Sequence, residues 1–304
     1  MSTDTRIDLG KMLSGAQLPA LPQSAIRLLE LSQNPDHGPA EFAVPIESDP
    51  GLTGQVLRFL NSSYFGFVQE ISSVKLGIAL VGIRTIKNFA LWSAVFSLMP
   101  NPKCGPFELK SLWQDSLRRA IFARRFGKLL GLAEAEDLFT AALLQDMAIP
   151  LLAKEMPHHY QELLNERDGG NVRLSDLERA RFGWSHAEAG GMMARGWKLP
   201  ESFADLVEVH TSLERLDQAS PDRREAAVCL AALLPSTCDP SWPERDQFVT
   251  AYHALAPAQN PTLDEVLQSV DHEFGDFAPV LKLAVPTRPL VDRLATTSEA
   301  STLP

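Results

Sequence analysis

Apolar residues recur every three or four positions along almost the whole chain, and no long stretch alternates apolar and polar residues as a half-buried strand does. Leu52, Val56 and Leu60, for example, follow one another at helical spacing. Before them, Asp49 and Pro50 are typical of a helix start, with the aspartate as N-cap and the proline as first helical residue. The pattern predicts an all-α fold.

Further signals divide this helical chain into parts. Capping boxes, in which a serine or threonine precedes a glutamate by three positions, begin at Ser175, Ser185 and Thr262. Residues 99–106 contain three prolines and a glycine and are the best candidate linker. We therefore expect a flexible N-terminus (1–15), an N-terminal helical subdomain (16–100), a larger helical bundle (105–215), additional C-terminal helices (216–286) and a loose tail (287–304).

Composition narrows the class of protein. The 304 residues are 45% hydrophobic and 22% charged, which is ordinary for a globular chain. A net charge of -10 argues against nucleic acid as a partner, because phosphates need a basic face. The longest uncharged apolar run, 89–99, is too short to span a bilayer. With Cys104, Cys229 and Cys238 expected as reduced thiols, we predict a cytoplasmic protein without a membrane partner.

The main candidate chemistry lies where a predicted helix presents Gln145 and Asp146. A histidine–aspartate pair at this point would hold a divalent cation, but the carboxamide of Gln145 is a poor ligand for zinc or iron. Asp115 stands on an earlier helix where a metal site would want another imidazole. Its spacing of three and four residues from Arg118 and Arg119 instead favours surface ion pairs.

Two downstream histidines complete the set of candidates. His186 lies in the first turn of a capped helix, and His210 lies near the end of another. Either can act as a ligand, and with Asp146 they would form a remnant three-ligand set. The alternative is structural: His186 packs or hydrogen-bonds near its helix start, and His210 faces the C-terminal end of a helix dipole. No other pair of histidines or cysteines has metal-ligand spacing, and His158 and His159 are expected to be solvated.

Other motifs favour structural roles. Four arginines and a lysine lie in residues 116–128, and Arg118, Arg125 and Lys128 fall within about a third of the helix circumference. We expect a solvated face there, with contact to an acidic partner as the alternative. The pair Gly190 and Gly191 favours close helix packing over phosphate binding. No GxSxG, P-loop, GxGxxG or HExxH motif is present.

These segments together resemble the HDOD family, whose modules occur in bacterial signalling proteins. The resemblance covers roughly residues 16–215. It is carried by LPALPQSAIRLLELSQNP, ESDPGLTGQVLRFLNSSYFGF and ISSVKLGIALVGIRTIKNFAL in the first half, and by AALLQDMAIPLL, FGWSHAEAGGMMARGWKLPESF and VEVHTS in the second. It implies an N-terminal helical subdomain packed on a bundle similar to the HD phosphohydrolase fold. Pro45 departs from the pattern by falling inside an expected helix.

The departures from an active HD site bear on function. Only the aspartate of the His-Asp pair is kept, as Asp146, whereas His186 and His210 match histidine positions of the pattern. The expected pocket is therefore an eroded metal site formed by Asp115, Gln145, Asp146, His186 and His210, with no catalytic residues, no bound metal and no cofactor. The resemblance implies a non-catalytic regulatory module that binds signalling proteins, such as receivers, sensor kinases or cyclic-dinucleotide enzymes.

Two alternatives remain at this stage. One is a metal-dependent phosphohydrolase acting on a nucleotide or cyclic dinucleotide, and the other is a small-ligand sensor that uses the eroded metal pocket. No receiver, diguanylate cyclase or EAL-type segment is visible, so we expect a stand-alone module. Its contact surface would be a groove between the N-terminal helices and the bundle. An exposed aromatic patch around Tyr64, Phe65 and Phe67 would support this surface, but we expect these aromatics to pack in the core of their turn.

Overall fold

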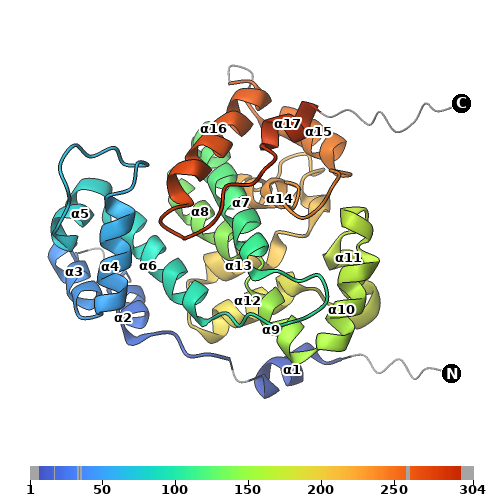
Figure 1. Cartoon of the computed structure of the whole chain (residues 1–304), viewed down its shortest axis with the longest axis horizontal. Helices are drawn as coiled ribbons and strands as arrows, with labels where there is room; N and C mark the ends of the chain where they lie inside the picture. The colour runs from blue at the N-terminus through green and yellow to red at the C-terminus, as the bar shows by residue number, and fades with distance from the viewer. Residues whose placement is uncertain (1–6, 17, 33, 35, 258–260, 296–304) are drawn as a thin grey trace, which may run out of the picture.

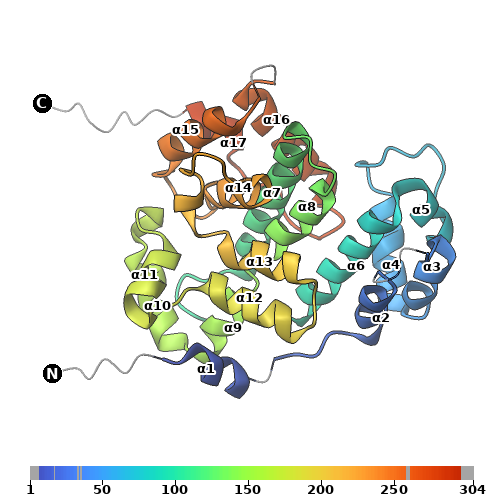
Figure 2. The same cartoon turned by 180° about the vertical axis from the view of Figure 1, so that it is seen from behind.

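A computed structural model describes residues 7–16, 18–32, 34, 36–257 and 261–295, and every regular element in these ranges is a helix (Figures 1 and 2). This confirms the predicted all-α class. The N-terminal part contains α1 (Leu9–Gly15), α2 (Gln23–Leu31), α3 (Pro39–Glu47), α4 (Pro50–Leu60), α5 (Val74–Val81) and α6 (Ile83–Leu98). The middle part contains α7 (Leu109–Leu129), α8 (Ala135–Leu144), α9 (Ala148–Glu155), α10 (Pro157–Glu166), α11 (Leu174–Phe182), α12 (His186–Gly196) and α13 (Glu201–Val209). The C-terminal part contains α14 (Arg223–Ala232), α15 (Arg245–Leu255), α16 (Leu263–Phe277) and α17 (Leu290–Ala295).

Local signals placed most helix starts correctly. Asp49 caps α4 by accepting a hydrogen bond from the Leu52 amide at 3.0 Å. The capping boxes that begin at Ser185 and Thr262 are both formed. Pro45 does not end α3, which continues through it to Glu47. Capping is a local interaction, so sequence alone can identify it.

The bundle is built around α7, which packs against α8, α14 and α16 (Figure 2). The N-terminal helices α2 to α5 form a separate lobe, and α6 runs from this lobe into the bundle, where it packs against α8 (Figure 1). Residues 88–95 of α6 are buried, and the Asn88 side chain donates to the Glu136 carbonyl of α8 at 3.0 Å. The two parts of the chain therefore share a core across α6.

The basic face predicted on α7 is only partly solvated, because α16 packs over Arg118 while the Lys128 side chain stays 58% exposed. Arg118 is buried and donates to Asp271 at 3.3 Å. Arg124 is buried against Glu273, and Arg125 donates to the same carboxylate at 2.8 Å. These arginines hold α16 on the bundle.

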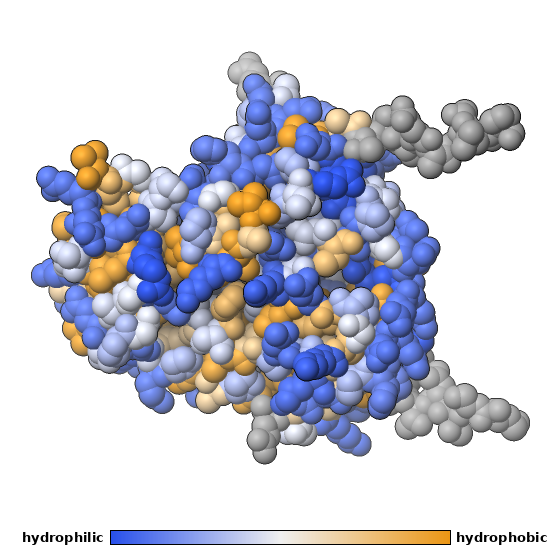
Figure 3. Space-filling model, viewed as in Figure 1, coloured by the Kyte–Doolittle hydropathy of each residue, from blue (hydrophilic) through white to orange (hydrophobic). Residues whose placement is uncertain are grey.

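The aromatic turn also packs inward, as we expected, and its three rings (Tyr64, Phe65 and Phe67) are half-buried. Tyr64 lies 4.4 Å from Phe277 by ring centroid, and the guanidinium of Arg124 lies 5.1 Å from the Tyr64 ring and 4.6 Å from the Phe139 ring. The exposed large apolar residues of this lobe are Val44, Val68, Leu76 and Leu80. Figure 3 shows hydrophobic residues gathered on this side of the molecule.

The described residues of the two terminal segments contain helices that the sequence did not predict. In place of a flexible segment, residues 9–15 form α1, which packs against α12, and the Trp184 indole donates to the Ile7 carbonyl at 2.7 Å. In place of a loose tail, α17 packs against α16 and buries Arg293. The predictions of a flexible segment (1–15) and a loose tail (287–304) also include residues 1–6 and 296–304, which lie outside the described residues.

Among the described helices, none alone has both the length and the apolar composition to cross a membrane. Taken together, α5 and α6 have both, but they are bent by 118° where they meet.

Replacing Arg124 with methionine should destabilise the protein by about 3 kcal/mol, because Glu273 loses a buried partner and three aromatic rings lose their cation. Urea denaturation would measure the change. Lys128→Met on the same helix is the matched control, since the Lys128 side chain is 58% exposed. An equal effect of both substitutions would refute a structural role for the Arg124 cluster.

Candidate functional site

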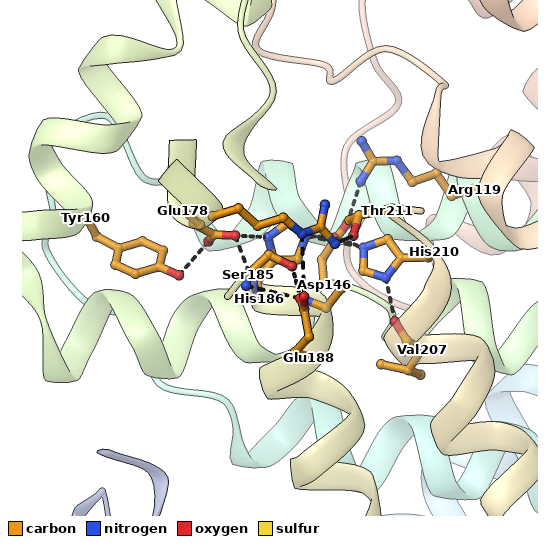
Figure 4. Close-up of polar contacts among 12 residues, drawn as sticks. Arg119, Asp146, Tyr160, Glu178, Ser185, His186, Glu188, Val207, His210 and Thr211 are labelled. Carbon is orange, nitrogen blue, oxygen red and sulfur yellow. Dashed lines mark hydrogen bonds and ion pairs between the residues drawn. The ribbon is translucent and has the colours of Figure 1, made fainter. Parts of the chain in front are cut away.

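Asp146, His186 and His210 converge in the interior of the bundle (Figure 4). Asp146 lies in the turn between α8 and α9, His186 is the first residue of α12, and His210 caps the C-terminus of α13. The Oδ1 atom of Asp146 lies 3.3 Å from Nε2 of His186 and 3.4 Å from Nε2 of His210. The two Nε2 atoms are 3.2 Å apart.

Close packing of α12 on α13 brings the two histidines together. A Cβ atom on Gly190 would lie 2.8 Å from a methyl carbon of Val207, and one on Gly191 would lie 2.9 Å from Cβ of Glu208. Real Cβ atoms do not approach other heavy atoms so closely. The glycine pair therefore serves helix packing, as the sequence predicted.

Each imidazole is oriented by a partner on its outer side. Glu178 accepts hydrogen bonds from the His186 amide at 2.8 Å and from His186 Nδ1 at 2.6 Å, and the Tyr160 hydroxyl donates to its other oxygen at 2.6 Å. The Val207 carbonyl accepts from His210 Nδ1 at 2.6 Å. Both Nε2 atoms are left facing Asp146, which is how metal-binding histidines are held in proteins.

Sequence reasoning missed Glu178 by assigning it to a capping box with Ser175. Arg173 precedes α11 as its N-cap, so Ser175 lies inside the helix. A signal was present, because Leu174, Glu178 and Phe182 follow one another at four-residue spacing. A carboxylate on an otherwise apolar face indicates a buried partner for it.

Asp115 does not form the surface ion pairs predicted for it. It is buried and accepts hydrogen bonds from the Ser236 hydroxyl at 2.5 Å and the Thr237 amide at 2.7 Å. Arg119, one turn further along α7, forms an ion pair with Oδ2 of Asp146 instead. The sequence placed Asp115 on the correct helix, α7, but wrongly assigned it to the exposed face of that helix.

Gln145 is fully buried, and neither its amide nitrogen nor its amide oxygen has a hydrogen-bond partner among the described residues. It lines a cavity of about 160 Å³, and the other four residues of the predicted pocket line the same cavity: Asp115, Asp146, His186 and His210. The structure thus brings all five candidates together around one space.

Burial and charge set the protonation of the cluster. Burial would raise the pKa of Asp146, but the Arg119 guanidinium and a hydrogen bond from His186 hold it well below its usual range. Burial would lower the pKa of His186, but the charges of Glu178 and Asp146 outweigh it and raise that pKa to about 9. Burial dominates at His210 and lowers its pKa. Burial likewise raises the pKa of Asp115, despite Arg119 nearby.

The spacing of the ligand atoms of Asp146, His186 and His210 fits one metal ion, but the neighbouring charged residues disfavour its binding. Tetrahedral ligands with bonds of 2.0–2.1 Å are about 3.3 Å apart, close to the three distances between Asp146 and the histidines. No other group of histidine, cysteine, aspartate or glutamate with this potential occurs in the described ranges. However, Arg119 already forms an ion pair with Asp146, the only carboxylate of the cluster. The carboxylate of Asp115 accepts hydrogen bonds from Ser236 and Thr237 instead of facing the cluster as a ligand.

Comparison with known proteins agrees with this architecture. Residues 18–213 match the family model described as the HDOD domain, close to the predicted range. The chain is similar to an HDOD domain protein with unknown function from Geobacter sulfurreducens, at 21% identity and a TM-score of 0.62, covering 96% of this chain and 93% of that one. It is also similar to a proposed phosphohydrolase from Shewanella amazonensis, at 20% identity and a TM-score of 0.62, covering 93% and 98%.

At these identities the solved structures show a shared fold alone. The fold predicted from the resemblance, an N-terminal helical subdomain packed on an HD-like bundle, is confirmed. An uncharacterised protein from Treponema pallidum is 23% identical over 197 residues, which is 64% of this chain and 38% of that protein. The chain therefore spans about two fifths of the length of this curated relative.

Replacing Glu178 with glutamine should cost about 2 kcal/mol of stability and lower the pKa of His186, because the neighbouring negative charge is lost and an amide cannot accept from all three present donors. Calorimetry and imidazole nitrogen chemical shifts would measure the two effects. Glu162→Gln is the matched control, since its side chain is 63% exposed and pairs only with Arg181 in the described structure. An unchanged His186 spectrum would contradict the orienting role of Glu178.

Of the three thiols, only Cys238 should react with a maleimide or iodoacetamide at pH 8. Cys238 is exposed and lines the cavity, whereas Cys104 and Cys229 are buried. Burial raises the pKa of Cys229 to about 12 and also raises that of Cys104, which keeps both as unreactive thiols. Mass spectrometry of the labelled native protein tests this, and modification of Cys229 before unfolding would contradict it.

Proposed function

Because the chain belongs to the HDOD domain family, we propose that it is a non-catalytic signal-transduction module that works by binding other signalling proteins. The observation that carries this proposal is the ion pair between Arg119 and Asp146. The family is associated with signalling, and this pair occupies the one carboxylate that a catalytic cation would need. The three metal-type residues then serve to hold α8, α12 and α13 together.

Charge explains why Arg119 disfavours a metal ion. At an effective dielectric constant of about 20, two unit charges of like sign about 4 Å apart repel by roughly 4 kcal/mol, and a divalent ion roughly doubles this. A cation sharing Asp146 with the guanidinium would meet that repulsion. It would also need to break an ion pair whose side chains are 15% and 4% exposed. Removal of one partner from such a buried pair is costly.

The contact surface we propose for a partner is the groove between the N-terminal lobe and the bundle. A cavity of about 110 Å³ lies there, lined by Leu29 of α2, Lys87 and Leu91 of α6, and Phe203 and Leu206 of α13 among others. Receivers, sensor kinases and cyclic-dinucleotide enzymes are the partner classes we propose.

A metal-dependent phosphohydrolase is the second candidate, favoured by the convergence of Asp146, His186 and His210. These three residues would hold the ion, which would activate a water molecule at neutral pH. Glu178 and the Val207 carbonyl would orient the imidazoles, as they already do. This function requires Arg119 to leave Asp146.

Protein purified without chelators should contain far less than one metal ion per chain, whereas Arg119→Ala should take up about one zinc ion, because three donors of suitable spacing are then released. Elemental analysis and zinc titration measure both. Arg27→Ala is the matched control, since Arg27 is an exposed arginine paired with Glu30. Circular dichroism with zinc present would verify that each variant folds.

The two candidate functions predict opposite results for the unsubstituted protein. Stoichiometric metal together with hydrolysis of a nucleotide or cyclic dinucleotide would refute the non-catalytic proposal. Absence of metal, no turnover with added manganese or iron, and metal uptake by Arg119→Ala alone would support it. Failure of Arg119→Ala to bind zinc, although folded, would show that Arg119 is not what keeps the ion out.

A further inference from the structure

The cavity beside the cluster contains buried neutral polar groups that the protein does not satisfy. Gln145 lines it with both amide atoms unpartnered, and Ser175 lines it with a buried hydroxyl that also lacks a partner in the described residues. A buried polar group without a hydrogen bond costs roughly 1–3 kcal/mol. Since no partner fixes the Gln145 amide, it can turn about its last torsion toward a molecule in the cavity.

The arginines around the cavity are each paired with a carboxylate, although Arg119 Nε and Arg167 Nε lack a hydrogen-bond partner among the described residues. Arg167 donates to Asp239 at 2.7 Å and Arg173 lies 3.0 Å from Glu244, while Arg119 holds Asp146. All six of these residues line the space. A phosphate or other strong anion would compete with a carboxylate for every one of these arginines. An uncharged ligand that forms hydrogen bonds would therefore leave these ion pairs intact.

Size and shape restrict the occupant further. A cavity of about 160 Å³ is comparable with an apolar cavity of about 150 Å³ that takes up benzene. Phe107, Trp242 and several aliphatic side chains form part of the wall. Aromatic side chains of this kind pack well against a flat ring. The space thus suits one ring system, with any larger substituent extending outward.

We propose that this cavity binds a neutral planar heterocycle with an adjacent hydrogen-bond donor and acceptor, the chemistry of a nucleobase, through the amide of Gln145. A carboxamide pairs with such an edge by two hydrogen bonds, as glutamine does with adenine. The proposal rests on the proposed function in one respect, that the Asp146 cluster is metal-free. It assigns a role to the carboxamide that stands where an active HD site would carry an imidazole.

The test is calorimetric titration of the full chain with adenine, hypoxanthine and uracil, with adenosine monophosphate and inorganic phosphate as comparisons. Gln145→Leu should lower the affinity for the preferred base about 10- to 100-fold. This variant should still fold, because it replaces an unpartnered buried amide by an apolar group of similar size. Gln268→Leu on α16 is the matched control, since Gln268 is exposed and does not line the cavity.

A second measurement locates the bound base. Cys238 is an exposed thiol that lines the cavity, so a saturating base should slow its alkylation several-fold in the unsubstituted protein and in Gln268→Leu. The same concentration should leave the alkylation rate unchanged in Gln145→Leu. Protection that is equal in all three proteins would place the base elsewhere and overturn the proposal.

Three further results would overturn it: no base binding at millimolar concentration, equal affinity in Gln145→Leu, or tighter binding of inorganic phosphate than of any base. One base bound per chain, with loss in Gln145→Leu alone, would support it. Metal content of the same samples separates this proposal from the proposed function. If the protein is metal-free and binds no base, only the proposal of a nucleobase ligand fails. If it contains stoichiometric metal, the proposed non-catalytic function fails.

Discussion

The ion pair between Arg119 and Asp146 is the interaction on which the centre of this protein depends. It joins α7, the middle helix of the bundle, to the turn that follows α8. Two histidines from α12 and α13 then face the same carboxylate. A buried carboxylate needs compensating charge and hydrogen bonds, and Asp146 receives both from Arg119 and His186. The cluster therefore links four segments of the fold through one side chain.

The residues around Asp146 have the arrangement of a metal centre, although this arrangement does not require a bound metal ion. Glu178 and the Val207 carbonyl fix both imidazoles so that their Nε2 atoms point inward. Such an arrangement suits a cation, yet a guanidinium already supplies positive charge to Asp146. The cluster can therefore keep its structure without a bound ion, because Glu178 and the Val207 carbonyl orient the two histidines.

Local features of the sequence were predicted well because they depend on neighbours along the chain. The N-cap at Asp49 and the capping box at Ser185 join residues only three positions apart. Similar reasoning failed for Ser175 and Glu178, where the same spacing occurs inside a helix that buries the glutamate. It also failed for Asp115, whose spacing from two arginines is that of a surface pair. Local spacing does not reveal which helix face is covered.

By itself, the sequence determined the helical class, the family, the position of most helix starts and five of the residues that line the pocket. Only the tertiary structure decided which charges are buried and how they are paired. Arg119 meets Asp146 from 27 positions away, and Asp115 meets Ser236 from 121 positions away. Such contacts arise when whole helices pack, and the free energy of burying a charge then selects its partner. No pattern of short-range spacing contains that information.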